Sequence, residues 1–141
     1  MILVKQINEI QVGDTATFAK TFSQGDIATY VAVTNDFSPI HINAGYAAGT
    51  RFGRTIVPGI LLGGLLTSTM ATDLVGCLPV STLDTFQFKA PVFVGDTIEA
   101  RLTIESVDVA KRSLVLAGVC INQDGRQVLI CHAEMRFPRS S

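Results

Sequence analysis

The stretch IVPGILLGGLLTSTMATDLVG, residues 56–76, decides the fold because Asp73 is its only charged residue. A helix that spans a membrane needs about 20 predominantly apolar residues in succession. This stretch instead opens at Pro58-Gly59 and carries several threonines, a serine and Asp73 in its second half. We therefore expect a buried helix over residues 59–75 inside a soluble fold, with no membrane contact.

The expected helix has no polar stripe along one side, so other parts of the chain must surround it. Gly63 and Gly64 stand inside it. Each glycine in a helix interior costs about 1 kcal/mol relative to alanine. That cost is acceptable where another backbone or a ligand must approach the helix closely.

Strand patterns follow the helix to the end of the chain. We expect strands over residues 82–90, 97–108, 112–122 and 127–137, separated by turn signals at 94–96, 110–112 and 123–125. Asp124-Gly125 between two apolar runs is a strong hairpin signal. The run SLVLAGVCI, residues 113–121, is apolar on both faces, which predicts a central strand covered on both sides.

Before the helix, the pattern changes from strand to helix to loop. Ala16 and Phe18, then Phe22 after a phase shift, alternate with polar residues as in a strand. Ser23 and Asp26 are typical of a helix start, so we expect a helix over 24–34. Pro39 argues against a helix through 36–40, which places His41 in a loop. Residues 43–49 allow a short helical turn, and 50–58 a loop. The whole order predicts an α+β fold, a curved antiparallel sheet around one apolar helix.

Composition narrows the class of protein. The 141 residues suggest a single domain over 1–141. The net charge of −1, from 11 basic and 12 acidic residues, does not indicate a surface that binds nucleic acid. The apolar content of 48% leaves surface for a second copy of the chain. Three cysteines without CxxC spacing argue against disulfides and zinc, so we expect small buried hydrophobes in a reducing cytoplasm. The first ten residues lack a signal-peptide pattern.

The stretch NDFSPIHIN, residues 35–43, carries the candidate chemistry. Asp36 precedes His41 by five residues, with Pro39 between them, and His41 is one of only two histidines. Either residue alone would more often be structural. Together, and followed by the Pro58-Gly59 helix start, they indicate a catalytic acid–imidazole pair. We expect the other histidine, His132, to be structural or to lie at the rim of the site.

Two segments resemble a known family. DFSPIHINAGYAAGTRFGRTIVPGILLGGLLTS, residues 36–68, resembles the hydratase motif of the MaoC-like, (R)-specific enoyl-CoA hydratases, and FKAPVFVGDTI, residues 88–98, resembles their strand-and-turn signature. The resemblance covers essentially the whole chain. It implies a hotdog fold, assembly as a homodimer or a larger even oligomer, and a pocket near the subunit interface. Pro58 departs from the histidine that many members have there.

The resemblance also implies roles for individual residues. Asp36 would deprotonate a water that His41 also holds, and the N–H of Gly59 would stabilise the charge that develops on the thioester oxygen. Thr67, where the family commonly has serine, would hydrogen-bond the Asp36–His41 pair. Asn43 would support the loop after His41.

The substrate would lie along the helix. We expect apolar tunnel walls from Ile60, Leu62, Leu66 and Met70. Candidates for meeting the phosphates of coenzyme A are Arg51, Arg54, Lys89 and Lys111. The scheme requires no metal and no cofactor, because the CoA thioester is itself the substrate.

The leading interpretation is reversible hydration of trans-2-enoyl-CoA to (R)-3-hydroxyacyl-CoA. The same reaction on an acyl-carrier-protein substrate is the alternative. A hotdog thioesterase is a weaker one, because those enzymes generally place a carboxylate elsewhere. A non-catalytic acyl-binding subunit would be free to lose Asp36 or His41. The sequence leaves open the acyl chain length and the pathway, whether polyester storage, β-oxidation or degradation of a substituted acid.

Overall fold

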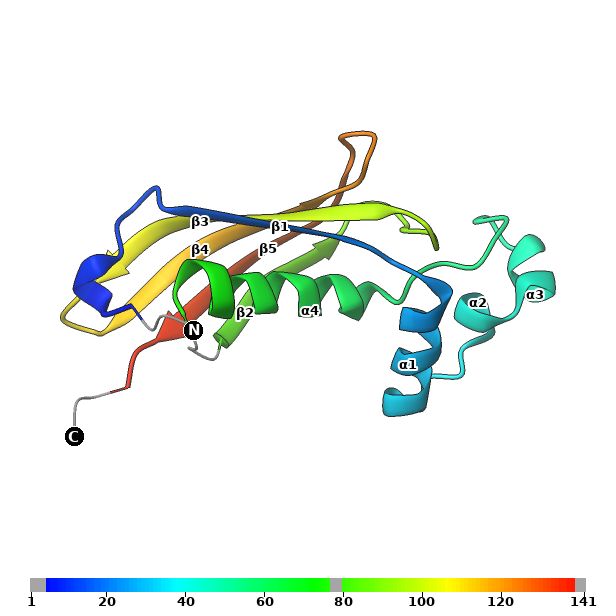
Figure 1. Cartoon of the computed structure of the whole chain (residues 1–141), viewed down its shortest axis with the longest axis horizontal. Helices are drawn as coiled ribbons and strands as arrows, with labels where there is room; N and C mark the ends of the chain where they lie inside the picture. Colours follow the sequence, from blue (N-terminus) through cyan, green and yellow to red (C-terminus); the bar gives the residue numbers. More distant parts are fainter. Residues whose placement is uncertain (1–4, 77–79, 139–141) are drawn as a thin grey trace.

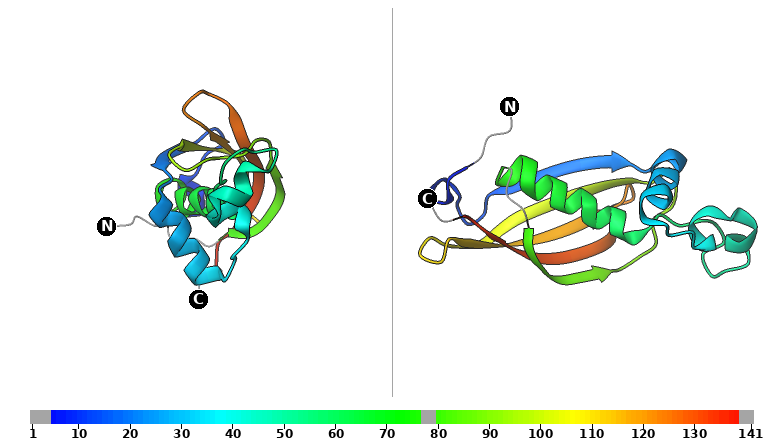
Figure 2. Two further views of the ribbon diagram at one scale, coloured as in Figure 1. Left: turned by 90° about the vertical axis from the view of Figure 1, so that its right-hand side faces the viewer. Right: turned by 90° about the horizontal axis from the view of Figure 1, so that it is seen from below.

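The computed structural model describes residues 5–76 and 80–138. Its centre is a five-stranded antiparallel sheet in the order β1-β3-β4-β5-β2, which curves around the helix α4 (Figures 1 and 2). The strands are β1 (Thr15–Thr21), β2 (Val80–Phe88), β3 (Thr97–Asp108), β4 (Ser113–Ile121) and β5 (Gln127–Arg136). This is the α+β arrangement that the sequence predicts, with strand ends within two residues of the expected ones.

The apolar stretch forms α4 (Gly59–Thr69) and continues as a π-helical turn, η2 (Met70–Leu74). The predicted helix over 59–75 is therefore confirmed, although its last turn is wider than an α-helix. Thr69 and Thr72 satisfy their hydroxyls on the helix itself, donating to the carbonyls of Leu65 at 2.8 Å and Ser68 at 2.7 Å. In the described part of the chain, every helix is too short or too polar to cross a membrane.

Glycines let the helix lie close to the sheet. A Cβ atom on Gly63 would come within 2.7 Å of Cζ of Phe86, and a Cβ atom on Gly118 would come within 3.0 Å of Cδ2 of Leu66. A larger residue at Gly63 would displace the Phe86 ring, and one at Gly118 would crowd Leu66 of α4. The expectation of close approach is thus met at Gly63, whereas a Cβ atom on Gly64 would meet nothing within 4 Å.

The central strand β4 is covered on one face only within the described chain. Its residues facing α4, among them Leu116 and Cys120, are fully buried. Val115, Ala117 and Val119 on the other face stay half-buried. The prediction that both faces are covered is wrong for the single chain, because all of the helix packing falls on one side. Cys120 and Cys131 are buried free thiols, as expected, while Cys77 lies outside the described residues.

Residues 24–55 form an overhang that extends beyond one end of the sheet (Figure 1). Its helices are α1 (Gln24–Thr34), α2 (Pro39–Ile42) and α3 (Ala44–Ala48), and a short 3-10 helix, η1 (Ile7–Glu9), lies before β1. The helix predicted over 24–34 is confirmed with its cap: Ser23 Oγ accepts from the N–H of Asp26, and Asp26 accepts from the N–H of Ser23. A turn at Asn35, with φ of 57°, ends α1.

The prediction that His41 lies in a loop is wrong. His41 belongs to α2, which starts at Pro39. Proline lacks an N–H, but the first helical position needs none, so Pro39 starts a helix here instead of preventing one. Its restriction falls on Ser38, which stays outside the helix. The turn places His41 on a defined helical face, opposite Asp36.

Candidate active site

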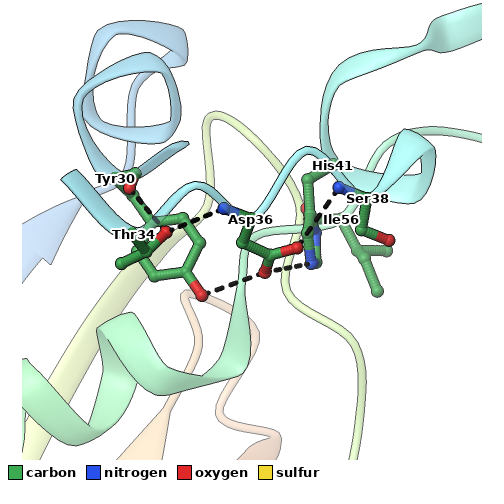
Figure 3. Close-up of polar contacts among 6 residues, drawn as sticks. All are labelled: Tyr30, Thr34, Asp36, Ser38, His41 and Ile56. Atoms are coloured by element: carbon green, nitrogen blue, oxygen red, sulfur yellow. Dashed lines mark hydrogen bonds and ion pairs between the residues drawn. The ribbon is translucent and has the colours of Figure 1, made fainter. Parts of the chain in front are cut away.

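Asp36 and His41 face each other at the junction of the overhang and the sheet. Oδ2 of Asp36 lies 3.8 Å from Nε2 of His41 (Figure 3). The histidine side chain is 12% exposed and the aspartate side chain 36%, so the pair is reachable from solvent on the carboxylate side. The structure therefore brings together the two residues that the sequence selected as catalytic.

The backbone of Ile56 fixes the tautomer of His41. Nδ1 of His41 lies 2.8 Å from the carbonyl oxygen of Ile56. A carbonyl oxygen can only accept a hydrogen bond, so the ring proton of neutral His41 is on Nδ1. Nε2 is then an acceptor that faces a carboxylate oxygen. Two acceptors at this separation match a water molecule that donates one hydrogen to each.

Ile56 also connects the overhang to the sheet. Its N–H donates to the carbonyl of Ile40 in α2 at 3.1 Å, and it forms an isolated β-bridge with Phe93. The next residue, Val57, donates to the carbonyl of Val92 at 2.7 Å. The backbone that orients His41 is therefore attached to the body of the fold.

Three hydrogen bonds hold Asp36 in place (Figure 3). Its Oδ1 accepts from the N–H of Ser38 at 3.2 Å, and its Oδ2 accepts from the hydroxyl of Tyr30 at 3.0 Å. Its own N–H donates to Oγ1 of Thr34 at 3.2 Å. Burial raises the pKa of Tyr30 above its ordinary value, and the hydrogen bond to Asp36 raises it further. The sequence analysis did not identify Tyr30 as a residue of the site.

The pair lies at a pocket of about 450 Å³. Its lining is mainly apolar and comes from α1, α2, the segment before α4, the first turn of α4, and β2 with the residues after it. The lining residues are Tyr30, Asp36, His41, Ile56, Val57, Pro58, Gly59, Ile60, Leu62, Phe86, Phe88, Ala90 and Val92.

Gly59 is the first residue of α4 and lines this pocket. The first N–H groups of a helix have no acceptor within the helix, and they form the positive end of its dipole. A negative oxygen in the pocket could therefore be stabilised there. A Cβ atom on Gly59 would come within 2.7 Å of Cζ of Phe88, so no larger residue fits without moving that ring.

Two of the four predicted tunnel residues line the pocket. Ile60 lies at its rim, 56% exposed, and Leu62 lies inside it. Leu66 and Met70 do not line the pocket of the single chain, because they are 0% exposed and belong to the core between helix and sheet. They occupy deeper turns of the helix than the pocket reaches.

The aromatic wall of the pocket was missed by the sequence analysis. Phe86 and Phe88 alternate along β2 and meet edge to face, with ring centroids 5.2 Å apart. Their period-two spacing places both rings on one face of the strand. That spacing was available in the sequence, but it does not say which face meets the pocket.

Within the single chain Thr67 does not contact the Asp36–His41 pair, so its predicted hydrogen bond to that pair stays a prediction for the assembled protein. Its hydroxyl donates to the carbonyl of Gly64 at 3.1 Å. Thr67 lies eight residues into α4, about 12 Å along the axis from Gly59, whereas the pair lies at the helix start. Asn43 caps α3, its Oδ1 accepting from the N–H of Tyr46 at 2.9 Å, which supports the segment after His41.

The four basic residues proposed to meet the phosphates of coenzyme A lie in different parts of the molecule. The guanidinium of Arg54 lies 3.9 Å from the ring centroid of Phe93, the residue after the pocket-lining Val92, and Lys89 is exposed and follows the pocket-lining Phe88. Arg51 is also on the overhang and stacks on Phe52. Lys111 lies in the β3–β4 hairpin with Asp108, at the opposite end of the sheet, so the prediction that it meets the same substrate is wrong within one chain (Figure 1).

Two further features bear on the earlier expectations. His132 lies 3.4 Å from Glu105, away from the pocket, which agrees with a structural role. Across residues 5–76 and 80–138, no three or more His, Cys, Asp or Glu side chains are grouped as a metal site would need.

A long helix wrapped by a curved antiparallel sheet, with an acid–imidazole pair beside the start of that helix, is the arrangement of a hotdog protein. The chain belongs to the MaoC-like domain family, whose sequence model matches residues 7–122. The family predicted from residues 36–68 and 88–98 is thereby confirmed.

Relatives of named activity support the same class. The chain is 30% identical over 129 residues to an (R)-specific enoyl-CoA hydratase of Aeromonas caviae, covering 92% of this chain and 96% of that one. It is 32% identical over 133 residues to the mitochondrial 3-hydroxyacyl-(acyl-carrier-protein) dehydratase FERN of Solanum lycopersicum, covering 93% and 79%. The unliganded R-hydratase PhaJ1 of Pseudomonas aeruginosa superposes with a TM-score of 0.86 and 31% identity, covering 95% of this chain and 86% of that one.

Proposed function

We propose that this chain is a lyase that reversibly hydrates trans-2-enoyl-CoA to (R)-3-hydroxyacyl-CoA. The observation that carries the proposal is the 3.8 Å approach of two acceptors, Oδ2 of Asp36 and Nε2 of His41, in an apolar pocket that Gly59 also lines. The (R) configuration and the CoA carrier are supported by the names of the relatives in Aeromonas and Pseudomonas.

The pair supplies the base for the reaction. A water between Asp36 and His41 donates one hydrogen to each, which aims its lone pairs away from both and toward the substrate. As its oxygen bonds to the β-carbon, one of its protons passes to the pair. Asp36 and His41 act as one unit in this transfer, since closely coupled groups share a proton.

The helix start supplies the place for the negative charge. When the oxygen adds to the β-carbon, the electrons of the double bond move through the α-carbon to the thioester oxygen. The N–H of Gly59, at the positive end of α4, stabilises that oxygen. The α-carbon then takes a proton back from the pair and the thioester carbonyl re-forms. The net change is the addition of H and OH across the double bond, and dehydration is its reverse.

The pocket surroundings suit a thioester with a long carrier arm. Apolar side chains accept the acyl group, while Arg54 and Lys89, each within two residues of a pocket-lining residue in the sequence, are the candidates for meeting a phosphate. The relative in Solanum is named for an acyl-carrier-protein substrate. A carrier protein is therefore the second candidate for the thiol component of the same reaction.

Exposed apolar side chains and an edge strand lead us to propose that the chain forms a homodimer. Strand β2 lies at the edge of the sheet, and its Leu83 is 40% exposed. On the overhang, Phe37 is 63% exposed and Tyr46 is 54% exposed. An edge strand and exposed apolar side chains each favour association. We expect a homodimer in which these surfaces are covered, measurable as molar mass by light scattering.

Ultraviolet absorbance of crotonyl-CoA tests the activity directly, because hydration removes the conjugated enoyl-thioester band. Loss of the band with the wild type, and its persistence with Asp36→Asn, would support the proposal. A coupled dehydrogenase specific for the (R)-alcohol then tests the stereochemistry. Faster turnover of crotonyl-acyl-carrier-protein would favour the second candidate. Release of free thiol without hydration would overturn the proposal in favour of a thioesterase.

A further inference from the structure

The ring of Phe86, which packs against Gly63, forms the inner end of the pocket. Phe86 of β2 pairs with Cys131 of β5, and Cys131 pairs with Gly118 of β4, so these residues form one row across the sheet. The ring of Phe86 lies against Gly63, where an added Cβ atom would come within 2.7 Å of its Cζ. Phe86 therefore stands between the sheet and α4 at the level of this row.

The core continues directly behind the same row. A Cβ atom on Gly118 would come within 3.0 Å of Leu66 Cδ2, so Leu66 sits on the row that includes Phe86. Leu66 and Met70 are both 0% exposed. The pocket lining reaches Leu62 and Phe86 and stops there.

Two independent measures give the depth of the pocket. From Gly59 to Gly63 the helix rises about 6 Å. From Phe88 to Phe86 the strand rises about 7 Å. The space between the start of α4 and the Phe86 row is therefore about one helical turn deep on both walls.

We infer that Phe86, held in place by Gly63, limits the acyl group to short chains. This rests on the proposed hydratase function. With the thioester oxygen at Gly59 and the β-carbon at the Asp36–His41 pair, little of the pocket remains for carbons beyond the double bond. Crotonyl-CoA and 2-hexenoyl-CoA fit this depth, whereas 2-octenoyl-CoA meets the Phe86 ring.

The test compares kcat/KM for crotonyl-, 2-hexenoyl- and 2-octenoyl-CoA in the wild type and in Phe86→Ala. In the wild type we expect the value to fall at least about tenfold from crotonyl to octenoyl, a size that pocket fit commonly reaches. In Phe86→Ala the octenoyl-to-crotonyl ratio should rise at least about tenfold. An unchanged ratio would overturn the inference. If the wild type hydrated none of the three, the proposed function itself would fail.

A pair of neighbouring glycines gives a matched control that does not depend on the alanine variant folding. Gly63→Ala should push the Phe86 ring into the pocket and reduce kcat/KM for 2-hexenoyl-CoA more than for crotonyl-CoA. The Cβ atom that Gly64→Ala adds would meet nothing within 4 Å, so this variant should leave the hexenoyl-to-crotonyl ratio of kcat/KM unchanged. Adding Phe86→Leu to Gly63→Ala should restore the ratio of kcat/KM for 2-hexenoyl-CoA to that for crotonyl-CoA. Equal effects of the two glycine variants, or no restoration, would contradict the Phe86 assignment.

A separate observation concerns Tyr30. Its hydroxyl donates to the same oxygen, Oδ2 of Asp36, that faces His41, at 3.0 Å and 3.8 Å respectively. The other carboxylate oxygen accepts from Ser38. Tyr30 therefore fills one acceptor direction of the oxygen that would hold the reacting water, and Figure 3 shows its ring reaching Asp36 from α1.

We infer that Tyr30 is a positioning residue for Asp36 in the proposed hydration. By occupying one lone pair of Oδ2, it leaves the remaining direction toward the space between Asp36 and His41. A half-buried tyrosine that merely satisfied its own hydroxyl could do so on any nearby acceptor. Here it binds the one oxygen on which the proposed water depends.

The first test is kinetic. Tyr30→Phe keeps the ring and removes the hydroxyl, and we expect kcat for crotonyl-CoA to fall about tenfold, at the low end of what a proton-transfer arrangement contributes, with little change in KM. The control is Tyr46→Phe, which changes an exposed tyrosine that does not line the pocket. A fall in melting temperature with kcat unchanged would mean that Tyr30 only packs, and would overturn the inference.

The second test needs no activity. The chain has two tyrosines and no tryptophan, so Tyr46→Phe leaves Tyr30 as the single source of phenolate absorbance. Because the carboxylate of Asp36 raises the pKa of Tyr30, adding Asp36→Asn should lower the titration midpoint. An unchanged midpoint would show that the two side chains are not coupled in solution. This readout separates a failure of the Tyr30 assignment from a failure of the proposed function.

Discussion

The overhang and the sheet–helix body are built on different principles. In the overhang, residues 24–55, few apolar side chains are fully buried, namely Ile27, Val31 and Ala47. Local hydrogen bonds hold it instead, such as the cap at Ser23 and the bonds to Asp36. The body has a continuous core in which Leu66 and Met70 are 0% exposed. The comparison teaches that the side chains proposed to react and the side chains that stabilise the fold lie in separate parts of the molecule.

The largest expected effect falls on activity alone. Asp36→Asn and His41→Gln should each lower kcat for crotonyl-CoA about 100- to 10,000-fold, because each removes a member of the proton-transfer pair. Thermal unfolding followed by circular dichroism should show nearly unchanged melting temperatures. A large loss of stability in both variants would contradict the separation of the two regions.

The next effect falls on stability alone. Leu66→Ala removes a fully buried side chain from the core. It should lower the free energy of unfolding by about 3 kcal/mol, the lost burial plus a cavity. Urea unfolding measures this, and kcat of the folded fraction should stay close to wild type. Val12→Ala, at a side chain 65% exposed, is the control and should stay within about 0.5 kcal/mol.

The body also carries a high-pH dependence of stability that comes from two buried thiols. Burial raises the pKa of Cys120 to about 12 and that of Cys131 to about 11, from an ordinary value of 9.0. The contribution of the two protonated thiols to the free energy of unfolding is therefore fully present below pH 9. It is lost as the pH rises toward 11 and 12, by up to about 1.4 kcal/mol per thiol and pH unit.

Urea unfolding at pH 7.5 and 10 measures this loss. The double variant Cys120→Ala and Cys131→Ala should lose less stability between the two pH values than the wild type does. An equal loss in both proteins would assign the dependence to other groups.

The smallest effect is expected at the start of the overhang. Ser23→Ala removes the cap of α1 and should lower the free energy of unfolding by about 1 kcal/mol, measured by urea unfolding.

The hydrogen bond from the Ser23 backbone, followed by that from Lys20, lowers the pKa of Asp26. The contribution of Asp26 is thus present above its unfolded pKa of about 4 and disappears as the pH falls through the lower folded value. Asp26→Asn should match the wild type more closely at pH 2 than at pH 7 in urea unfolding.

Sequence reasoning succeeded where the signal is local. The cap at Ser23, the turn at Asp124-Gly125 and the uncharged run 56–76 each act through neighbours in the chain, and the helix and strands follow them. The Asp36–His41 pair also spans only a few residues, so its proximity could be anticipated. The family motif supplied the place of Gly59 at the start of α4.

The differences between prediction and structure have another cause. Leu66, Met70 and Thr67 were assigned to the site from their place in one apolar run, whereas which residues line the pocket of the single chain depends on helix phase and on how deep the pocket reaches. Phe86 enters the site through the register of β2 against β5. Tyr30 enters it through the turn at Asn35, which folds the end of α1 toward Asp36. These are relations between elements, and the spacing of one segment does not contain them.

The attachment of Ile56 to both Ile40 and Phe93 has an evolutionary consequence. The chain from Asn43 to Thr55 leaves the site at His41 and returns beside it at Ile56, so its two ends are fixed independently of what lies between. Doubling the length of a flexible loop costs only about 0.6 kcal/mol. Insertions between residues 49 and 54 should therefore be tolerated without disturbing the pair. This is the place where descendants of the chain can acquire a new lid or recognition element while keeping the same chemistry.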